Sequence, residues 1–272
     1  MRKRGPEWQN LPFFVHLQVL PPGGRVGLHD RCPMPLPDRS PISPSNATPV
    51  RMRAVVFDLD GTLIESLPLI AASVNKVAQA HGFPPFEEET VRAAIGDGAR
   101  VLIERLFSSV STEGDLVALL SEFLTEYTGR TAEESDPWRP GARALLDSAR
   151  AQGLRLAILT NKPLPLTEAI LAKTETRALF DSVRAPENSP APKPDPRALT
   201  DLLEEAGLAP EETIFVGDSV VDFETGARAG VETIGLRGGY GGEGGTPPDL
   251  WLDDPPALAA WLDREVDARE RV

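Results

Sequence analysis

Cysteine is almost missing from the 272-residue sequence, which contains one, Cys32. A single thiol excludes an intramolecular disulfide and is typical of a reducing compartment. No apolar run is long enough to cross a bilayer. Basic residues are few, 28 against 41 acidic ones, and the formal net charge is -13, whereas nucleic-acid-binding proteins present a basic surface. We therefore expect a cytoplasmic protein that binds neither nucleic acid nor membrane.

The first 50 residues differ from the rest of the chain, because ten of them are proline. Prolines at this density remove backbone donors and interrupt helices, so the segment cannot build a core of its own. A basic start precedes an apolar stretch, as in a secretion signal, but Pro12, His16 and Gln18 interrupt that stretch. We predict that residues 1–51 are a disordered leader, or an artefact of a start site that really lies at Met52.

From residue 53 onward, apolar runs with strand character alternate with segments of helical period. The runs end in polar residues and predict strands at 53–60, 154–161, 213–218, 232–236 and 250–252. Between them, apolar residues recur three and four apart and predict helices at 141–153, 165–180, 195–208, 221–230 and 255–266. This alternation predicts an α/β fold with a doubly wound parallel sheet, in which ligands gather at the carboxyl ends of the strands.

Residues 67–135 break this alternation. The segments 67–82, 88–107 and 114–129 are helical by period, and the insert contains no strand pattern. We predict that residues 52–66 and 136–272 form the α/β core and that 67–135 form a small helical domain inserted after the first strand. The two crossings, near Ser66 and Pro137, are short enough to serve as a hinge.

Four polar motifs follow one another along this pattern, and we expect each of them at a strand end. The first is "DLDGTL" at 58–63, where Asp58 and Asp60 place two mutually repelling carboxylates just before Gly61. The others are "TNK" at 160–162, "KPDP" at 193–196 and "GDSVVD" at 217–222. Each motif alone is an ordinary turn, loop or helix cap. Four of them at the same edge of one sheet favour a shared site.

In this order, the four motifs resemble the signature motifs of the haloacid dehalogenase superfamily, and the helical insert resembles its mobile cap. The segments "RPGARALLDSARAQGLRLAILTNKP", "VGDSVVDFETGARAG" and "AAIGDGARVLIERL" are similar to the phosphoglycolate phosphatase branch. The resemblance covers about residues 53–240. It implies a Rossmann-like core with a helical cap, and a Mg²⁺-dependent phosphatase that works through an aspartyl-phosphate intermediate.

The resemblance also implies a role for each aspartate of the motifs. Asp58 would be the nucleophile, and one of its oxygens would bind Mg²⁺. Asp60 would protonate the leaving oxygen and then activate water, while its backbone carbonyl binds the metal. Asp218 would be a further metal ligand, and Asp222 would orient metal-bound water or Lys193.

The remaining motif residues would bind the phosphoryl group. By resemblance, the Thr160 hydroxyl and the Asn161 backbone grip phosphoryl oxygens, and Lys193 offsets the charge between the nucleophile and the phosphoryl group. Such a fixed cation matters in a chain with a net charge of -13. The repulsion between the two aspartates of the first motif is then offset, because a metal and a lysine lie against them.

A loop in the cap is the candidate for substrate selection. The segment "GDGAR" would descend over the substrate and exclude water, with possible contacts from Gly96, Asp97, Gly98 and Arg100. For Arg100, as for Arg105, the sequence favours a solvated cap residue over a substrate ligand. The partner implied is a small-molecule phosphate ester, 2-phosphoglycolate being the first choice, and the protein could be a monomer or a homodimer.

Other branches of the superfamily fit the sequence less well. A dehalogenase would lack Asp60, because its leaving group needs no proton. A phosphonatase needs a cap lysine for a Schiff base, and Lys76, the one lysine of the insert, lies in unlike surroundings. A β-phosphoglucomutase-like enzyme usually has a serine-rich second motif rather than "TNK". Phosphatases of pyrophosphate, nucleoside monophosphates or sugar phosphates stay open, as does a catalytically idle relative that binds a phosphometabolite.

Overall fold

The computed structural model of the chain describes residues 52–110, 112–133, 136–241 and 244–270, the last four of these by their backbone alone. The predicted leader at 1–51, with Cys32, lies outside the described residues. Within the described part, no helix combines the length and the hydrophobicity needed to cross a membrane.

The described residues form one six-stranded parallel sheet in the order β3-β2-β1-β4-β5-β6. The strands are β1 (Ala54–Phe57), β2 (Arg155–Leu159), β3 (Ser182–Arg184), β4 (Thr213–Gly217), β5 (Glu232–Leu236) and β6 (Leu250–Leu252). All four residues of β1 are buried, as expected for a central strand covered on both faces. The predicted α/β fold with a doubly wound parallel sheet is confirmed.

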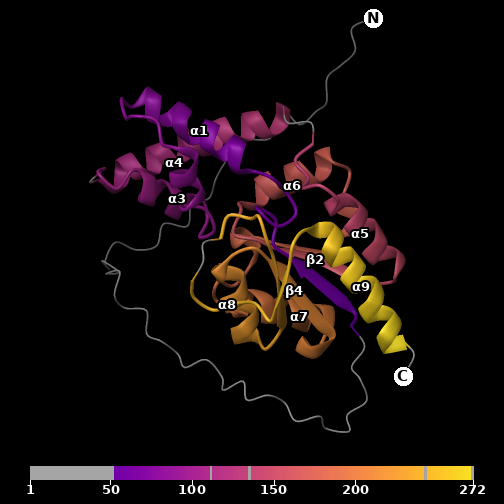
Figure 1. Cartoon of the computed structure of the whole chain (residues 1–272). Coiled ribbons are helices and arrows are strands. Elements are labelled where there is room, and N and C mark those ends of the chain that lie inside the picture. Colours follow the sequence, from indigo (N-terminus) through magenta and orange to yellow (C-terminus); the bar gives the residue numbers. More distant parts are fainter. Residues whose placement is uncertain (1–51, 111, 134–135, 242–243, 271–272) are drawn as a thin grey trace, which may run out of the picture. The chain divides into compact units, whose positions relative to one another are not determined.

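Helices cover both faces of the sheet, and the alternation of side chains along β1 shows how. Val55 and Phe57 pack in one apolar cluster with α5 (Ala142–Ala151), α6 (Leu164–Lys173) and α9 (Pro255–Glu270). Ala54 and Val56 point to the other face and pack against α7 (Arg197–Ala206). Helix α8 (Val220–Ala229) lies beside α7 on that face (Figure 1).

The insert between β1 and β2 is helical, as predicted. Its helices are α1 (Leu67–Ala80), α2 (Glu88–Arg92), α3 (Ala99–Leu106) and α4 (Glu113–Glu133). They share an apolar cluster separate from those of the sheet, although Leu166 and Tyr240 of the core also join it. The chain leaves the core at Ser66 and returns beside Ile64, which pairs with Trp138. The domain limits at 66/67 and 135/136 stay predictions.

Three elements differ from the sequence-based prediction. The helix predicted at 165–180 ends at Lys173, the last residue of α6. The helical period over 88–107 is interrupted, because Gly96 and Gly98 adopt positive φ angles of 122° and 94° and separate α2 from α3. Strand β3 was not predicted. It is three residues long, and only its central Val183 is buried, so it has neither an apolar run nor a clear alternation.

Candidate active site

The site lies where the strand order reverses, at the carboxyl ends of β1 and β4. These strands are neighbours, with Phe57 paired to Val216, so the residues that follow them emerge side by side. The Asp58 amide continues the pairing by donating to the Val216 carbonyl at 2.9 Å. Asp58 and Asp218 are 160 residues apart in sequence, and the sheet brings them together at the point where open α/β sheets bind ligands.

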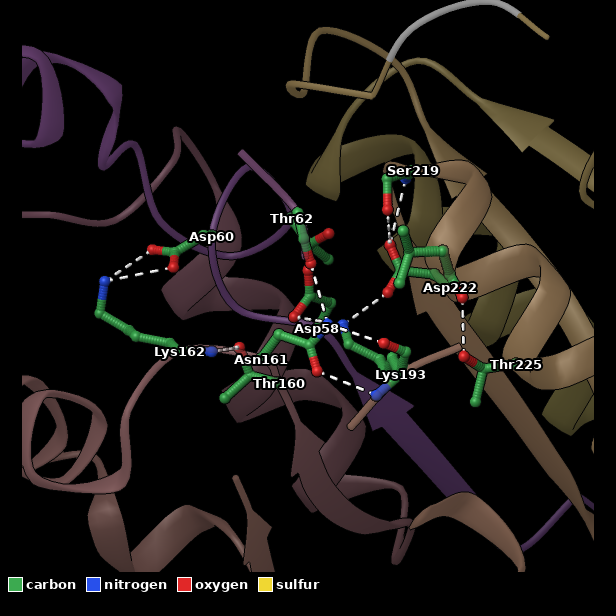
Figure 2. Close-up of polar contacts among 12 residues, drawn as sticks. Asp58, Asp60, Thr62, Thr160, Asn161, Lys162, Lys193, Ser219, Asp222 and Thr225 are labelled. Atoms are coloured by element: carbon green, nitrogen blue, oxygen red, sulfur yellow. Dashed lines mark hydrogen bonds and ion pairs between the residues drawn. The ribbon is translucent and has the colours of Figure 1, made fainter. Parts of the chain in front are cut away.

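Three buried carboxylates meet at this point. Oxygens of Asp58, Asp218 and Asp222 all lie within 4.8 Å of one another. Lys193 joins them: its ammonium is 2.8 Å from Asp58 Oδ1 and 2.6 Å from Asp222 Oδ1 (Figure 2). The Lys193 side chain is only 2% exposed, so the ammonium is held by these two acids rather than by bulk water. Three of the four predicted motifs are thereby brought into one cluster.

Asp218 is fixed by hydrogen bonds that favour its charged form. Its Oδ1 accepts from the Thr62 hydroxyl at 2.8 Å, and its Oδ2 accepts from the backbone amides of Tyr240 at 2.6 Å and Gly241 at 3.3 Å. Gly61 packs directly on this carboxylate, since a Cβ there would lie 2.6 Å from Asp218 Oδ2. The φ of +81° at Gly61 also disfavours any other residue.

Both oxygens of Asp222 are occupied by donors from the protein. Oδ1 accepts from Lys193, and Oδ2 accepts from the Ser219 hydroxyl at 2.8 Å and the Ser219 amide at 3.1 Å. Asp222 stands in the first turn of α8, so the helix start sets its direction. The contact expected between Asp222 and Lys193 is present. Whether Asp222 orients anything beyond this lysine stays a prediction.

Burial and the crowding of negative charge raise the pKa values of two carboxyl groups in this cluster. Burial, together with the neighbouring Asp222 and Asp218, raises the pKa of Asp58 to about 7, although Lys193 opposes the rise. Burial and Asp222 raise the pKa of Asp218 to about 6, against the hydrogen bonds from Tyr240 and Thr62. The pKa of Lys193 is raised even though burial lowers it, because Asp222 and Asp58 stabilise the ammonium.

The cluster fits a divalent cation. Three buried carboxylates face a single ammonium, so the site has a surplus of negative charge that a metal ion would neutralise. Carboxylate oxygens are the hard ligands that Mg²⁺ prefers. These three carboxylates would hold the ion, and the choice of Asp58 and Asp218 rather than Asp222 as its ligands stays a prediction. The expected contribution of the Asp60 carbonyl stays a prediction.

The side chain of Asp60 turns away from this cluster. Both of its oxygens accept from the Lys162 ammonium, at 2.9 and 3.2 Å (Figure 2). The same ammonium donates to the Tyr127 hydroxyl of α4 at 2.5 Å. Although burial opposes it, the neighbouring Asp60 and Tyr127 raise the pKa of Lys162.

Sequence reasoning missed Lys162 and Tyr127. The "TNK" motif contains Lys162, but a lysine in a loop before proline is ordinarily solvated. Tyr127 lies on the apolar face of a predicted helix, where an aromatic residue is first read as core. Only the position of Lys162 directly after two predicted phosphate-binding residues could have drawn attention to it.

Thr160 and Asn161 lie at the carboxyl end of β2, as predicted. The Asn161 side chain ties the loops around the site together, because its amide donates to the Gly96 and Lys193 carbonyls at 2.9 and 3.0 Å. Its Oδ1 accepts from the Lys193 amide at 2.9 Å. The Thr160 hydroxyl accepts from the Lys162 amide at 3.2 Å. The phosphate-binding roles of Thr160 and Asn161 stay predictions.

The predicted cap loop borders the site only in part. Gly96 and Gly98 line the pocket above the aspartates, and a Cβ on Gly98 would lie 3.3 Å from the Asn161 carbonyl. Asp97 pairs with Arg105. Arg100 donates to Glu104 and Glu113, both at 2.7 Å, so this structure shows it paired with acids of the cap.

The pocket lies between core and cap. Asp58, Asp60 and Asp218 form its polar floor, with Thr160 and Lys162 beside them. Its upper wall is largely apolar and includes Ile70, Ile95, Leu102, Phe123 and Leu166. A small molecule with one strongly charged end would meet the aspartates at that end and apolar side chains at the other.

Comparison with known proteins places this architecture in a family. The chain is 36% identical over 216 residues to phosphoglycolate phosphatase of Pseudomonas putida, which covers 76% of this chain and 78% of that one. It is 32% identical over 221 residues to N-acetylmuramic acid 6-phosphate phosphatase of Pseudomonas aeruginosa, covering 80% of this chain and 97% of that one.

A solved structure agrees with these relatives. The crystal structure of a predicted phosphoglycolate phosphatase from Haemophilus somnus superposes with a TM-score of 0.72 at 30% identity, covering 78% of this chain and 98% of that one. The family model of haloacid dehalogenase-like hydrolases matches residues 52–230, which contain all four motifs and the helical insert. This protein therefore belongs to the haloacid dehalogenase-like hydrolases.

Proposed function

We propose that the protein is a Mg²⁺-dependent phosphatase that hydrolyses a small phosphate monoester through a phosphorylated Asp58. The observation that carries this proposal is the placement of Asp58: a buried carboxylate 2.8 Å from a buried ammonium and within 4.8 Å of two further carboxylates. A nucleophilic aspartate must approach a phosphate dianion, so its surroundings have to screen negative charge. Lys193 provides part of this screening, and Mg²⁺ when bound supplies the rest.

The proposed reaction has two steps. An Asp58 oxygen attacks phosphorus and the bond from phosphorus to the leaving oxygen breaks, while that oxygen takes a proton from the Asp60 carboxyl group. A water then attacks the phosphorus of the aspartyl phosphate and gives its proton to the Asp60 carboxylate, while the bond from phosphorus to the Asp58 oxygen breaks. Inorganic phosphate leaves, and Asp58 and Asp60 return to their starting forms. Asp60 lines the same pocket as Asp58, which this scheme requires.

We propose 2-phosphoglycolate as the first substrate to test. The relative from Pseudomonas putida carries that activity in its name, and its similarity extends over most of both chains. A sugar 6-phosphate is the second candidate, since the relative named for N-acetylmuramic acid 6-phosphate is matched over 97% of its length. The apolar upper wall of the pocket is compatible with either leaving group, so cap residues decide between them.

A substrate panel tests the proposal. Purified protein is assayed for phosphate release from 2-phosphoglycolate, N-acetylmuramic acid 6-phosphate, pyrophosphate, a nucleoside monophosphate, glucose 6-phosphate and p-nitrophenyl phosphate. Each assay is run with Mg²⁺ and with EDTA. We expect EDTA-sensitive release, with one metabolite preferred. Equal rates for every compound would contradict the proposed substrate but not the proposed phosphatase activity. No release from any compound would contradict the phosphatase and favour an idle phosphometabolite-binding protein.

A further inference from the structure

We propose that Lys162 and Tyr127 are positioning residues: Tyr127 of the cap anchors the Lys162 ammonium, which in turn fixes the Asp60 carboxylate for its proton transfers. The inference rests on the proposed function, in which Asp60 gives a proton to the leaving oxygen and takes one from water. It joins three elements that are distant in sequence: the loop after β1, the loop after β2 and helix α4.

The contacts of Lys162 hold its ammonium in one place. Two of its N–H groups are used by the Asp60 oxygens, at 2.9 and 3.2 Å, and the third reaches the Tyr127 hydroxyl at 2.5 Å. An ammonium has three donors, so this set is complete. The Lys162 side chain is 2% exposed, against 16% for Asp60. The lysine is therefore the fixed member of the ion pair.

Tyr127 is a rigid anchor for this lysine. Its ring is buried and stacks on Phe123, with the centroids 5.6 Å apart and the planes 20° apart. The hydroxyl of this fixed ring accepts from the Lys162 ammonium at 2.5 Å. Helix α4 thus holds the ammonium through the hydroxyl of one tyrosine.

The position of Asp60 explains why its carboxylate needs a cation of its own to hold it. Its carboxylate points away from the cluster around Lys193, as Figure 2 shows, so Lys193 does not hold it. A group that transfers protons must stay within hydrogen-bond reach of the reacting oxygen. Since Lys162 chelates both oxygens, it restricts the carboxylate to one place in the pocket.

Substrate binding is the competing role for a cation in the pocket. Lys162 lines the pocket and could meet a carboxylate of the substrate. Its three donors are already used, and it would have to release Asp60 or Tyr127 to bind an anion. The contacts therefore favour positioning over recognition, and the two roles predict different kinetics.

The test is the dependence on the leaving group, measured for Lys162→Met and Tyr127→Phe. p-Nitrophenolate leaves without a proton, whereas an alkoxide needs one. For Lys162→Met, we expect kcat/KM to fall about 100-fold with an alkyl phosphate, within the range of acid–base catalysis, and less than about 3-fold with p-nitrophenyl phosphate. The loss should lie in kcat, with KM little changed. Tyr127→Phe keeps the ring and the ion pair, so its loss should be smaller and equally selective.

Lys173→Met is the matched control. Lys173 also ties the core to α4, donating to the Thr131 and Ala132 carbonyls at 3.1 and 2.7 Å, but it does not touch Asp60. If the role of Lys162 were to attach the cap to the core, Lys173→Met would show the same selectivity between leaving groups as Lys162→Met. We expect the control to show none.

Several results would overturn the inference. Equal losses of kcat/KM with both leaving groups would do so, because kcat/KM reports the step in which the leaving group departs and not the later attack of water. A rise in KM confined to carboxylate-bearing esters would also do so, and it would assign Lys162 to recognition. Should Lys162→Met fail to fold, Tyr127→Phe decides, and an unselective Tyr127→Phe counts against the proposal. A wild-type protein that releases no phosphate from any ester would instead contradict the proposed function, so the two failures are distinguishable.

Discussion

At the scale of single residues, the site depends on how closely the chain packs around its carboxylates. Gly61 shows this most directly, because its missing side chain leaves the space that Asp218 occupies. A positive φ is shared by glycines elsewhere, including Gly82, where a Cβ would meet nothing within 4 Å. The two positions therefore separate the cost of backbone strain from the cost of crowding the Asp218 carboxylate.

We predict that Gly61→Ala weakens metal binding, whereas Gly82→Ala does not. Both variants should lose roughly 1–2 kcal/mol of unfolding free energy from the strained φ. Only Gly61→Ala should raise the Mg²⁺ concentration for half-maximal activity, by about 10-fold, as loss of support for a ligand typically does. Denaturant unfolding and metal titration of activity measure the two effects. A matching Mg²⁺ requirement in both variants would refute the crowding argument.

The Asp58→Asn variant tests the proposed role of Asp58 as the nucleophile. An amide cannot attack phosphorus, so phosphate release should fall by at least about 10³-fold, the scale on which removal of a nucleophile acts. The folded protein should be no less stable, because the change removes one of three clustered buried charges and leaves the contact between Lys193 and Asp222 intact. Thermal unfolding of the variant checks this second point. Substantial residual turnover would contradict nucleophilic catalysis by Asp58.

Sequence reasoning located some of these residues and not others, for physical reasons. Asp58 and Asp218 could be placed together because they end strands, and the ends of adjacent parallel strands share one edge of the sheet. Lys162 could not, since no local pattern says whether a loop lysine points to solvent or inward. Its direction is set by Tyr127, a residue of the insert 35 positions earlier.

At the scale of elements, the entry into the cap is fixed by a loop of the core. The Tyr240 hydroxyl, which lies beyond β5, accepts from the amides of Ser66 at 2.6 Å and Leu67 at 3.0 Å, where α1 begins. It donates to Glu65 at 2.7 Å. The backbone amide of the same residue donates to Asp218. One residue therefore connects the candidate metal site with the first helix of the insert.

We predict that Tyr240→Phe lowers stability by about 1–3 kcal/mol, the usual cost of leaving buried polar groups unpaired. For a domain of this size, the corresponding fall in Tm is roughly 3–10 °C. Glu65→Gln is the control, since its amide oxygen can still accept from the phenol, and it should lose less than half as much. Thermal unfolding followed by circular dichroism gives both values. Equal losses would show that Glu65, rather than the start of α1, is the partner that matters.

Element boundaries also show where periodicity stops being informative. The apolar pattern over 88–107 continues across the break between α2 and α3, because residues of both helices pack in the same cluster. Only the glycines at 96 and 98 mark the interruption, and a glycine pair can equally sit inside a helix at some cost. Strand β3 escapes prediction because an edge strand of three residues buries too little to leave a pattern.

At the scale of the whole molecule, the charge cluster links stability to pH and metal. In the metal-free protein, burial raises the pKa of Asp58 to about 7 and of Asp218 to about 6, above the value of 3.8 for a free carboxyl. Between the pKa of a free carboxyl and the raised pKa of each aspartate, the folded state therefore binds more protons than the unfolded state. The contribution of both groups to stability is present below about pH 4 and is lost as the pH rises through 6 and 7.

Mg²⁺ should reverse this loss, because it competes with protons for the same oxygens. We predict that saturating Mg²⁺ raises Tm more at pH 8 than at pH 5.5, each compared with EDTA. Asp218→Asn should reduce the metal-dependent rise at pH 8. Differential scanning calorimetry at the two pH values measures it. A rise of the same size at both pH values would mean that the metal binds elsewhere.

The reversal of strand order at β1 has a consequence for how the protein is made. Asp58 follows the first strand and Asp218 follows the fourth, with Lys193 and the helices of the insert in between. During synthesis, the nascent chain therefore carries Asp58 for some 160 residues before the ribosome adds Asp218, the carboxylate that lies beside it in the folded protein. A chain released before β4 and α8 would contain Asp58 and Lys193 but lack Asp218 and Asp222, so it could not complete the cluster of three carboxylates.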